Sequence, residues 1–114
     1  MGYTNYWHQY NDFTDAEWKQ IKEEFSYIKE TVGFLIKDES TEDIIKFNGK
    51  NDDGHETFIL KKDAKPFNFK KDYEGQDTSF YFCKTNGKPY DIAVWSLLSF
   101  INRICPSVAI SRDR

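Results

Sequence analysis

The sequence has few of the residues that build the commonest small reactive sites. Among its 114 residues are only two cysteines, two histidines, three prolines and one methionine. Cys83 and Cys105 are too few for a disulfide framework and too far apart for a zinc knuckle, so both are expected to be reduced core thiols. No run approaches the roughly eighteen apolar residues that cross a bilayer, and the first residues show no signal-peptide pattern. We therefore expect a cytoplasmic protein that does not enter membranes.

Positive charge is also scarce where nucleic acid would need it. Sixteen Lys and Arg residues stand against nineteen Asp and Glu residues, which gives a net charge of −3. General nucleic-acid binding requires clustered cations that displace counterions, so this balance argues against it. The chain also lacks a glycine-rich phosphate loop, and no cofactor is predicted.

Aromatic residues, by contrast, are abundant: 10 Phe, 7 Tyr and 3 Trp make up 18% of the chain. Charged residues make up 31%, so the aromatic and charged side chains must be sorted onto different faces. Such a composition is typical of a folded chain with a dense core and unlike that of a disordered one. The length predicts a single domain over residues 1–114.

Two helices can be read from the pattern. Thr14 followed by Glu17 is a capping box, and Phe13 with Trp18 forms a hydrophobic staple. Apolar residues then recur every three or four positions at Trp18, Ile21, Phe25, Ile28 and Val32, which predicts an amphipathic helix that ends at Gly33.

The second helix is predicted between Pro89, as its first residue, and Pro106. It is apolar around most of its circumference, so we expect it at the centre of the molecule, covered on more than one side. If one chain cannot cover it, a second copy would have to, and a homo-oligomer therefore stays open.

Short β-prone runs occupy the rest of the chain. They are Tyr3–His8, Phe34–Lys37, Ile44–Phe47, Thr57–Leu60, Ser79–Cys83 and Val108–Ser111. Turn signals within Asn48–Glu56 predict a hairpin with a long tip, and residues 61–78 are expected to form a loop. The order of elements predicts an α+β fold, in which an antiparallel-rich sheet has two helices packed on one face.

The segment from Lys84 to Asp91 is the first candidate site. It combines Lys84, Thr85, Asn86 and Lys88 with a glycine-containing turn before a helix, where free N–H groups and the helix dipole favour an anion. The alternative is an ordinary strand-to-helix turn, in which Thr85 or Asp91 satisfies the open backbone donors.

Aromatic and polar residues elsewhere complete the candidate site. The run from Tyr3 to His8 interleaves rings with hydrogen-bonding groups, as stacking platforms do, although cores and subunit interfaces do so too. The predicted ligand-binding residues are Tyr3, Thr4, Trp7, Asn48, His55, Glu56, Lys84, Thr85, Asn86, Lys88, Tyr90 and Asp91. His8, His55 and Glu56 are competent metal ligands but lack a metal-binding spacing, so neither a metal site nor a catalytic residue is predicted.

Three ordered motifs carry a resemblance to a known family. They are Met1-Gly2-Tyr3-Thr4, then Phe47-Asn48-Gly49 with Gly54-His55-Glu56-Thr57-Phe58, then Phe82-Cys83-Lys84-Thr85 running into Pro89-Tyr90-Asp91. Together they resemble an uncharacterised family of small proteins of bacteriophages and bacteria. The resemblance covers most of the chain and implies a phage origin, which would place the protein in the host cytoplasm. It implies no biochemical activity.

Three functions follow as hypotheses. The first is a non-enzymatic binding protein with a pocket for a small polar or phosphorylated, nucleotide-like ligand, sequestering a host immune signal if the source is a phage. The second is an interaction module that binds and inhibits a host protein through exposed aromatic anchors. The third is a small metal-dependent hydrolase that uses His8, His55 and Glu56.

Overall fold

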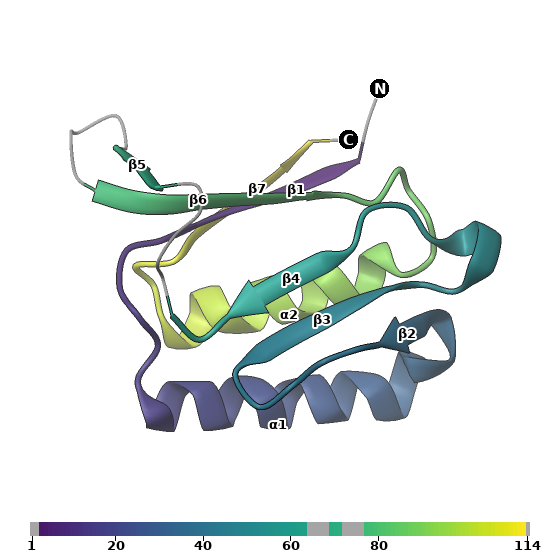
Figure 1. Cartoon of the computed structure of the whole chain (residues 1–114), viewed down its shortest axis with the longest axis horizontal. Coiled ribbons are helices and arrows are strands. Elements are labelled where there is room, and N and C mark those ends of the chain that lie inside the picture. Colours follow the sequence, from purple (N-terminus) through teal and green to yellow (C-terminus); the bar gives the residue numbers. More distant parts are fainter. Residues whose placement is uncertain (1–2, 64–68, 72–76, 114) are drawn as a thin grey trace.

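A computed structural model describes residues 3–63, 69–71 and 77–113, and Figure 1 shows how the elements are arranged. In chain order they are β1 (Thr4–Gln9), α1 (Asp15–Val32), β2 (Ile36–Asp38), β3 (Ile44–Gly49), β4 (Phe58–Lys61), β5 (Phe69–Lys71), β6 (Asp77–Lys84), α2 (Asp91–Ile104) and β7 (Ala109–Asp113). Short 3-10 helices cover Gly33–Leu35 and Asn51–Asp53. The architecture is α+β, as the sequence predicts.

The strands form two antiparallel sheets rather than one. Sheet A has the order β5-β6-β1-β7, and sheet B has the order β2-β3-β4. In sheet A, β1 pairs with β6 from Thr4 opposite Lys84 to Gln9 opposite Ser79, and it pairs with β7 along its other edge. Figure 1 shows sheet A across the top of the molecule and both helices below it. The two helices therefore share one side of sheet A.

Helix α1 begins where the sequence predicts. The Thr14 hydroxyl accepts a hydrogen bond from the Glu17 N–H at 3.1 Å, and the Glu17 carboxylate accepts one from the Thr14 N–H at 2.9 Å. Phe13 stacks on Trp18 with ring centroids 5.9 Å apart, so the capping box and the staple are both confirmed. The helix buries Trp18, Ile21, Phe25 and Ile28.

Helix α2 lies in the core, as expected, and packs against α1, β1 and β7 of the same chain. Its fully buried residues are Ala93, Val94, Leu97, Leu98 and Ile101. Ile92 is 53% exposed, so the helix is not covered all round. Pro89 is not its first residue, because the Asp91 N–H bonds to the Lys88 carbonyl at 2.9 Å in a turn that precedes the helix. In the described part of the chain, no helix is long and apolar enough to span a membrane.

Two further local predictions are wrong. A strand was expected over Phe34–Lys37, but Gly33–Leu35 form a 3-10 helix in which the Ile36 N–H bonds to the Gly33 carbonyl, and β2 starts at Ile36. The loop expected over residues 61–78 contains β5 and the first residues of β6. Pairing with a neighbouring strand outweighs local charge there. The remainder of that prediction, residues 64–68 and 72–76, lies outside the described residues.

A row of aromatic rings joins the two sheets to α1. Trp7 of β1 is 1% exposed; its ring stacks on Tyr81 at 5.5 Å and lies 5.1 Å from Phe58 of β4. Phe58 lies 5.1 Å from Phe47 of β3, and Phe47 stacks on Phe25 of α1 at 5.3 Å. One hydrophobic core therefore connects both sheets and both helices.

Truncation of the central ring in this row should be costly. Phe47→Ala should lower the free energy of unfolding by about 3–5 kcal/mol, because it opens a cavity between Phe25 and Phe58. Equilibrium unfolding in urea measures the change. Phe34→Ala is the matched control: Phe34 is 71% exposed, and its removal should change stability by less than about 0.5 kcal/mol. Equal losses in the two variants would contradict this description of the core.

Candidate functional site

The turn between β6 and α2 is held against the start of β1. The Tyr3 carbonyl accepts hydrogen bonds from the N–H groups of Thr85 and Asn86, at 2.8 and 3.4 Å. Asn86 and Gly87 have positive φ angles of 54° and 71°. A Cβ atom on Gly87 would lie 3.0 Å from the Tyr3 ring. Glycine thus suits both the backbone conformation and the close approach of the Tyr3 ring.

The first N–H groups of α2 are already used. The Asp91 N–H bonds to the Lys88 carbonyl at 2.9 Å, and the Ile92 N–H bonds to the Pro89 carbonyl at 3.4 Å. The next two N–H groups both bond to the Tyr90 carbonyl, at 3.0 and 3.3 Å. The open backbone donors that were expected to hold an anion are therefore absent from this end of the helix. Recognition of an anion here would depend on side chains.

Asp91 is the centre of a polar network that links four elements. Its Oδ1 accepts hydrogen bonds from Asn5 Nδ2 at 2.8 Å and from the Thr85 hydroxyl at 2.6 Å. Its Oδ2 forms an ion pair with Arg112 of β7, and both side chains of that pair are mostly buried. The Arg112 guanidinium lies over the Trp95 ring, 4.5 Å from its centroid. The network fixes β1, the turn after β6, α2 and β7 relative to one another.

An open hollow of about 410 Å³ lies beside this network. It is lined by Tyr3, Gly87, Lys88, Pro89, Asp91, Ile92, Trp95, Ser96 and Arg112. We call it the α2 hollow. It presents two cationic side chains, one carboxylate and two aromatic rings. This combination suits a ligand that has both a negative charge and a flat ring.

Three of the predicted ligand-binding residues, Tyr3, Lys88 and Asp91, line the α2 hollow. Thr85 is fully buried beneath it and donates its hydroxyl to Asp91, while Thr4 is 5% exposed. Asn86 is exposed within the same turn. The N-terminal strand and this turn are therefore brought together, although only some of their side chains reach the hollow.

The end of the hairpin tip reaches the same turn from the other side. The Glu56 N–H bonds to the Lys84 carbonyl at 3.2 Å, and the Lys84 N–H bonds to Glu56 Oε1 at 2.7 Å. The Tyr90 hydroxyl donates to the Glu56 carbonyl at 2.5 Å, and burial raises the pKa of Tyr90 well above its usual range. Glu56 and Tyr90 thus join the two sheets at this end.

Asn48 and His55 belong to the hairpin tip itself. Asn48 Nδ2 donates to the His55 carbonyl at 3.0 Å and to the Thr57 hydroxyl at 3.2 Å. Its Oδ1 accepts hydrogen bonds from the N–H groups of Gly49 and His55, at 2.7 and 3.0 Å. The Asn48 side chain is therefore occupied in shaping the tip, and His55 is exposed beyond it.

A second and larger space, of about 600 Å³, lies between β4 and β6. Its lining residues are Trp7, Glu56, Thr57, Ile59, Lys61, Tyr81 and Phe82. We call it the β4–β6 cleft. Of the predicted residues, Trp7 and Glu56 lie here rather than in the α2 hollow. The predicted residues therefore divide between two spaces.

Sequence reasoning missed Trp95 and Arg112 as lining residues of the α2 hollow. Trp95 could have been found, because it lies four residues after Asp91 and thus on the same face of the helix. Arg112 carried no local signal. It reaches Asp91 because β7 pairs with β1 in a register that sets Arg112 opposite Asn5.

The reactive groups considered from the sequence are not assembled into a catalytic or metal site. Burial raises the pKa of both the Cys83 and the Cys105 thiol to about 12. In sheet A, His8 lies opposite Phe80 of β6, whereas Glu56 bonds to Lys84, four residues further along the same strand. At about 3.3 Å per residue, Phe80 and Lys84 are about 13 Å apart, so His8 and Glu56 contact well-separated positions of β6. Among the described residues, no three His, Cys, Asp or Glu side chains are grouped to hold a metal ion.

Comparison with known proteins found no matching family model, no matching curated protein and no matching solved structure. The resemblance to the phage and bacterial family stays a prediction.

Removal of the Asp91 carboxylate should destabilise the protein. Asp91→Ala leaves Arg112 without its counter-ion and removes the acceptor of Asn5 and Thr85, so the free energy of unfolding should fall by about 2–3 kcal/mol. Urea unfolding measures this loss. The control is Asp52→Ala, at an exposed position in the hairpin tip, which should leave the urea midpoint unchanged. An unchanged midpoint in Asp91→Ala would show that the network is not structural.

The two thiols should be unreactive in the folded protein. With pKa values of about 12, on the order of one thiol in 10,000 is ionised near pH 8, and both are buried. The measurement is the rate of thiolate release from Ellman's reagent, with the urea-unfolded protein as the control that reacts at both cysteines. Rapid reaction of either cysteine in the folded state would contradict the burial described above.

Proposed function

We propose that this protein binds a small ligand that carries an anionic group and a flat ring, such as a nucleotide, without transforming it. The observation that carries the proposal is the placement of Lys88 beside Tyr3 and Trp95 in the α2 hollow. Among the described residues, Lys88 has no ion-pair partner. Its ammonium group is therefore available to a phosphate or carboxylate.

Charge supports an anionic ligand of small size. Arg112 and Asp91 form an ion pair, so their charges largely cancel, and Lys88 leaves the hollow with a net positive charge. A hydrogen bond to a charged group contributes about 1.5–3 kcal/mol. The volume of about 410 Å³ falls within the range of small-molecule sites, roughly 300–1,000 Å³.

The aromatic rings support a flat group on the ligand. Tyr3 is 39% exposed, so part of its ring is open to a ligand. Trp95 is partly buried, and its ring faces the Arg112 guanidinium. Stacking of a base on an aromatic side chain contributes about 1–3 kcal/mol. A ring and an anion on one ligand would use both features at once.

The charged groups of the hollow also favour binding over chemistry. Asp91, its one lining carboxylate, already accepts hydrogen bonds from Asn5, Thr85 and Arg112. A general base must be within hydrogen-bond reach of a substrate proton and able to accept it. Asp91 is committed to the fold instead. In this proposal the ligand is held and later released unchanged, and a phage origin would make a nucleotide-derived immune signal the ligand to test first.

A thermal-shift panel of nucleoside monophosphates, cyclic dinucleotides and inorganic phosphate tests the proposal. A probe at a hundred times its dissociation constant should stabilise the protein by about 2.7 kcal/mol, or about 10 °C in Tm. Fluorescence locates the binding: Trp7 and Trp18 are buried at 1% and 3% exposure, so a probe in the α2 hollow should quench Trp95.

Lys88→Ala should weaken binding of the responding probe about tenfold or more, because it removes the unpaired cation. Lys19→Ala, which removes an exposed lysine of α1, is the matched control and should bind as the wild type does. No thermal shift with any probe in the panel would refute the proposal for this class of ligand. Equal affinity in the two lysine variants would move the site away from the α2 hollow.

A further inference from the structure

The β4–β6 cleft lies where β4, the edge strand of sheet B, approaches the part of β6 that follows its pairing with β5 at Asp77–Ser79. At one end, the Glu56 N–H bonds to the Lys84 carbonyl. Beyond that bond, β4 and β6 belong to different sheets, and the cleft opens between them. An edge strand presents unpaired N–H and C=O groups, so the direction of these groups decides what the cleft can bind.

On β6, the main-chain groups of Phe82 point into the cleft. Lys84 uses both its N–H and its C=O to bond to Glu56 across the gap, whereas the Thr85 N–H bonds to Tyr3 on the β1 side. In an antiparallel ladder, each residue directs its N–H and its C=O to the same side of the strand, and every second residue uses the same side. Phe82 therefore points its N–H and C=O to the same side as Lys84.

On β4, the same reasoning applies to Ile59. The Lys62 N–H bonds to Asp43 on the β3 side, at 3.0 Å. Lys46 of β3, which lies opposite Ile59, bonds instead to Ser40 and Glu39 on its far side. Ile59 therefore points its N–H and C=O away from β3 and into the cleft. Neither the Ile59 nor the Phe82 main chain bonds to another residue within the described part of the chain.

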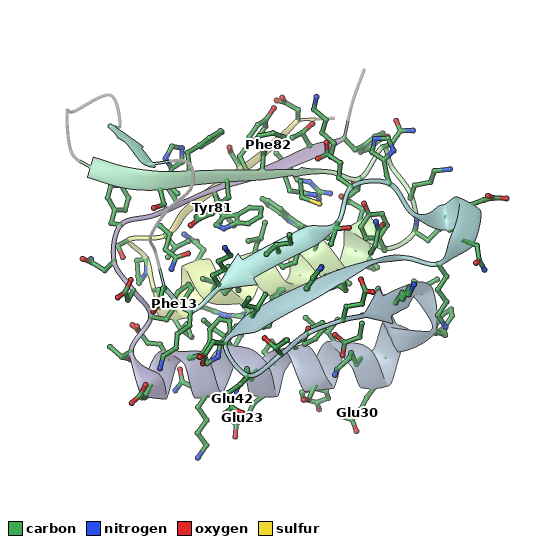
Figure 2. All side chains as sticks on the ribbon, in the orientation of Figure 1. Phe13, Glu23, Glu30, Glu42, Tyr81 and Phe82 are labelled. Carbon is green, nitrogen blue, oxygen red and sulfur yellow. The ribbon has the colours of Figure 1, made fainter. Side chains whose placement is uncertain are left out.

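The walls of the cleft are apolar and partly open. Ile59 is 39% exposed and Phe82 is 47% exposed. Figure 2 shows Tyr81 directed from β6 toward the space between the two sheets, with Phe82 on the other side of the strand. Trp7 also lines the cleft, and its buried Nε1–H has no acceptor among the described residues. A buried donor without a partner is unusual and marks a place where a ligand could supply an acceptor.

We propose that the β4–β6 cleft binds one extended strand of a partner protein, with apolar side chains at alternating positions. Its main chain would bond to Ile59 on one side and to Phe82 on the other, and so join sheets A and B. Because β4 and β6 run in opposite directions, the added strand is antiparallel to one and parallel to the other. This proposal does not depend on the small-ligand site in the α2 hollow.

The dimensions and chemistry of the cleft favour a strand over a small apolar molecule. Its lining residues on β4 and just before it run from Glu56 to Lys61, which at about 3.3 Å per residue is about 17 Å, the length of an ordinary strand. An apolar molecule would fill the space but leave four main-chain groups and the Trp7 donor without partners. A peptide main chain carries donors and acceptors on both of its edges.

Peptides selected from a phage-displayed library of random linear sequences are the probe. The tightest of them, made synthetically, is added to ¹⁵N-labelled protein, and amide hydrogen exchange is followed by NMR. Exchange at Ile59 and Phe82 should slow at least tenfold on binding. Recovery of no peptide above background, or protection confined to other amides, would overturn the proposal. If protection at these two amides grows with protein concentration in the absence of peptide, a second copy of the chain occupies the cleft. That result would also overturn the proposal.

A proline at position 59 gives the matched mutational test. Ile59→Pro removes only a donor that faces the cleft, which an edge strand tolerates, and it should weaken peptide binding at least tenfold. The control is Ile110→Pro: Ile110 lies opposite Trp7 on the free edge of sheet A, and its substitution should leave binding unchanged. Equal affinities in the two variants would refute strand addition. If Ile59→Pro does not fold, Ile59→Thr, which retains the main chain, should still lower the affinity because it removes apolar surface that lines the cleft.

Discussion

The packing of Trp7 between the two sheets is the contact on which the rest of this structure depends. Its ring lies against Tyr81 of sheet A and Phe58 of sheet B. In the described part of the chain, no other pair of rings joins sheet A to sheet B. Phe47 and Phe25 extend the same row to α1. Sheet B and α1 are thereby attached to sheet A through ring packing, with main-chain hydrogen bonding between the sheets at Glu56 and Lys84.

This way of joining two sheets explains where the open spaces lie. Hydrogen bonds of Glu56 hold the segment before β4 to Lys84 of β6. Beyond them, the gap between β4 and β6 is lined by residues that include Trp7 and Tyr81. The α2 hollow lies at the turn that follows β6, where the Tyr3 ring closely approaches Gly87. The two proposed sites have no lining residue in common, and they use different chemistry: unpaired main-chain groups in the cleft, and charged and aromatic side chains in the hollow.

Asp91 gives the α2 hollow its shape and also sets its charge. The carboxylate holds Asn5, Thr85 and Arg112, which come from three different strands or turns. Because it neutralises Arg112, it leaves Lys88 as the cation that an anionic ligand would meet. The sequence placed Asp91 in the candidate site for its position before a helix, but its partners show that it organises the site rather than contacting a ligand freely.

Local interactions could be predicted from the sequence alone: the Thr14–Glu17 capping box, the stripe of α1, the apolar α2 and the nearness of Lys88 and Asp91 within one turn. These depend on residues a few positions apart or on one well-marked segment. The strand order, the division into two sheets and the contribution of Arg112 came only from the tertiary structure. The physical reason is that β-pairing and buried polar contacts join residues that are distant in the sequence. Asn5 and Asp91, for example, are 86 positions apart and share a hydrogen bond. No local pattern specifies which strand will be the neighbour of another.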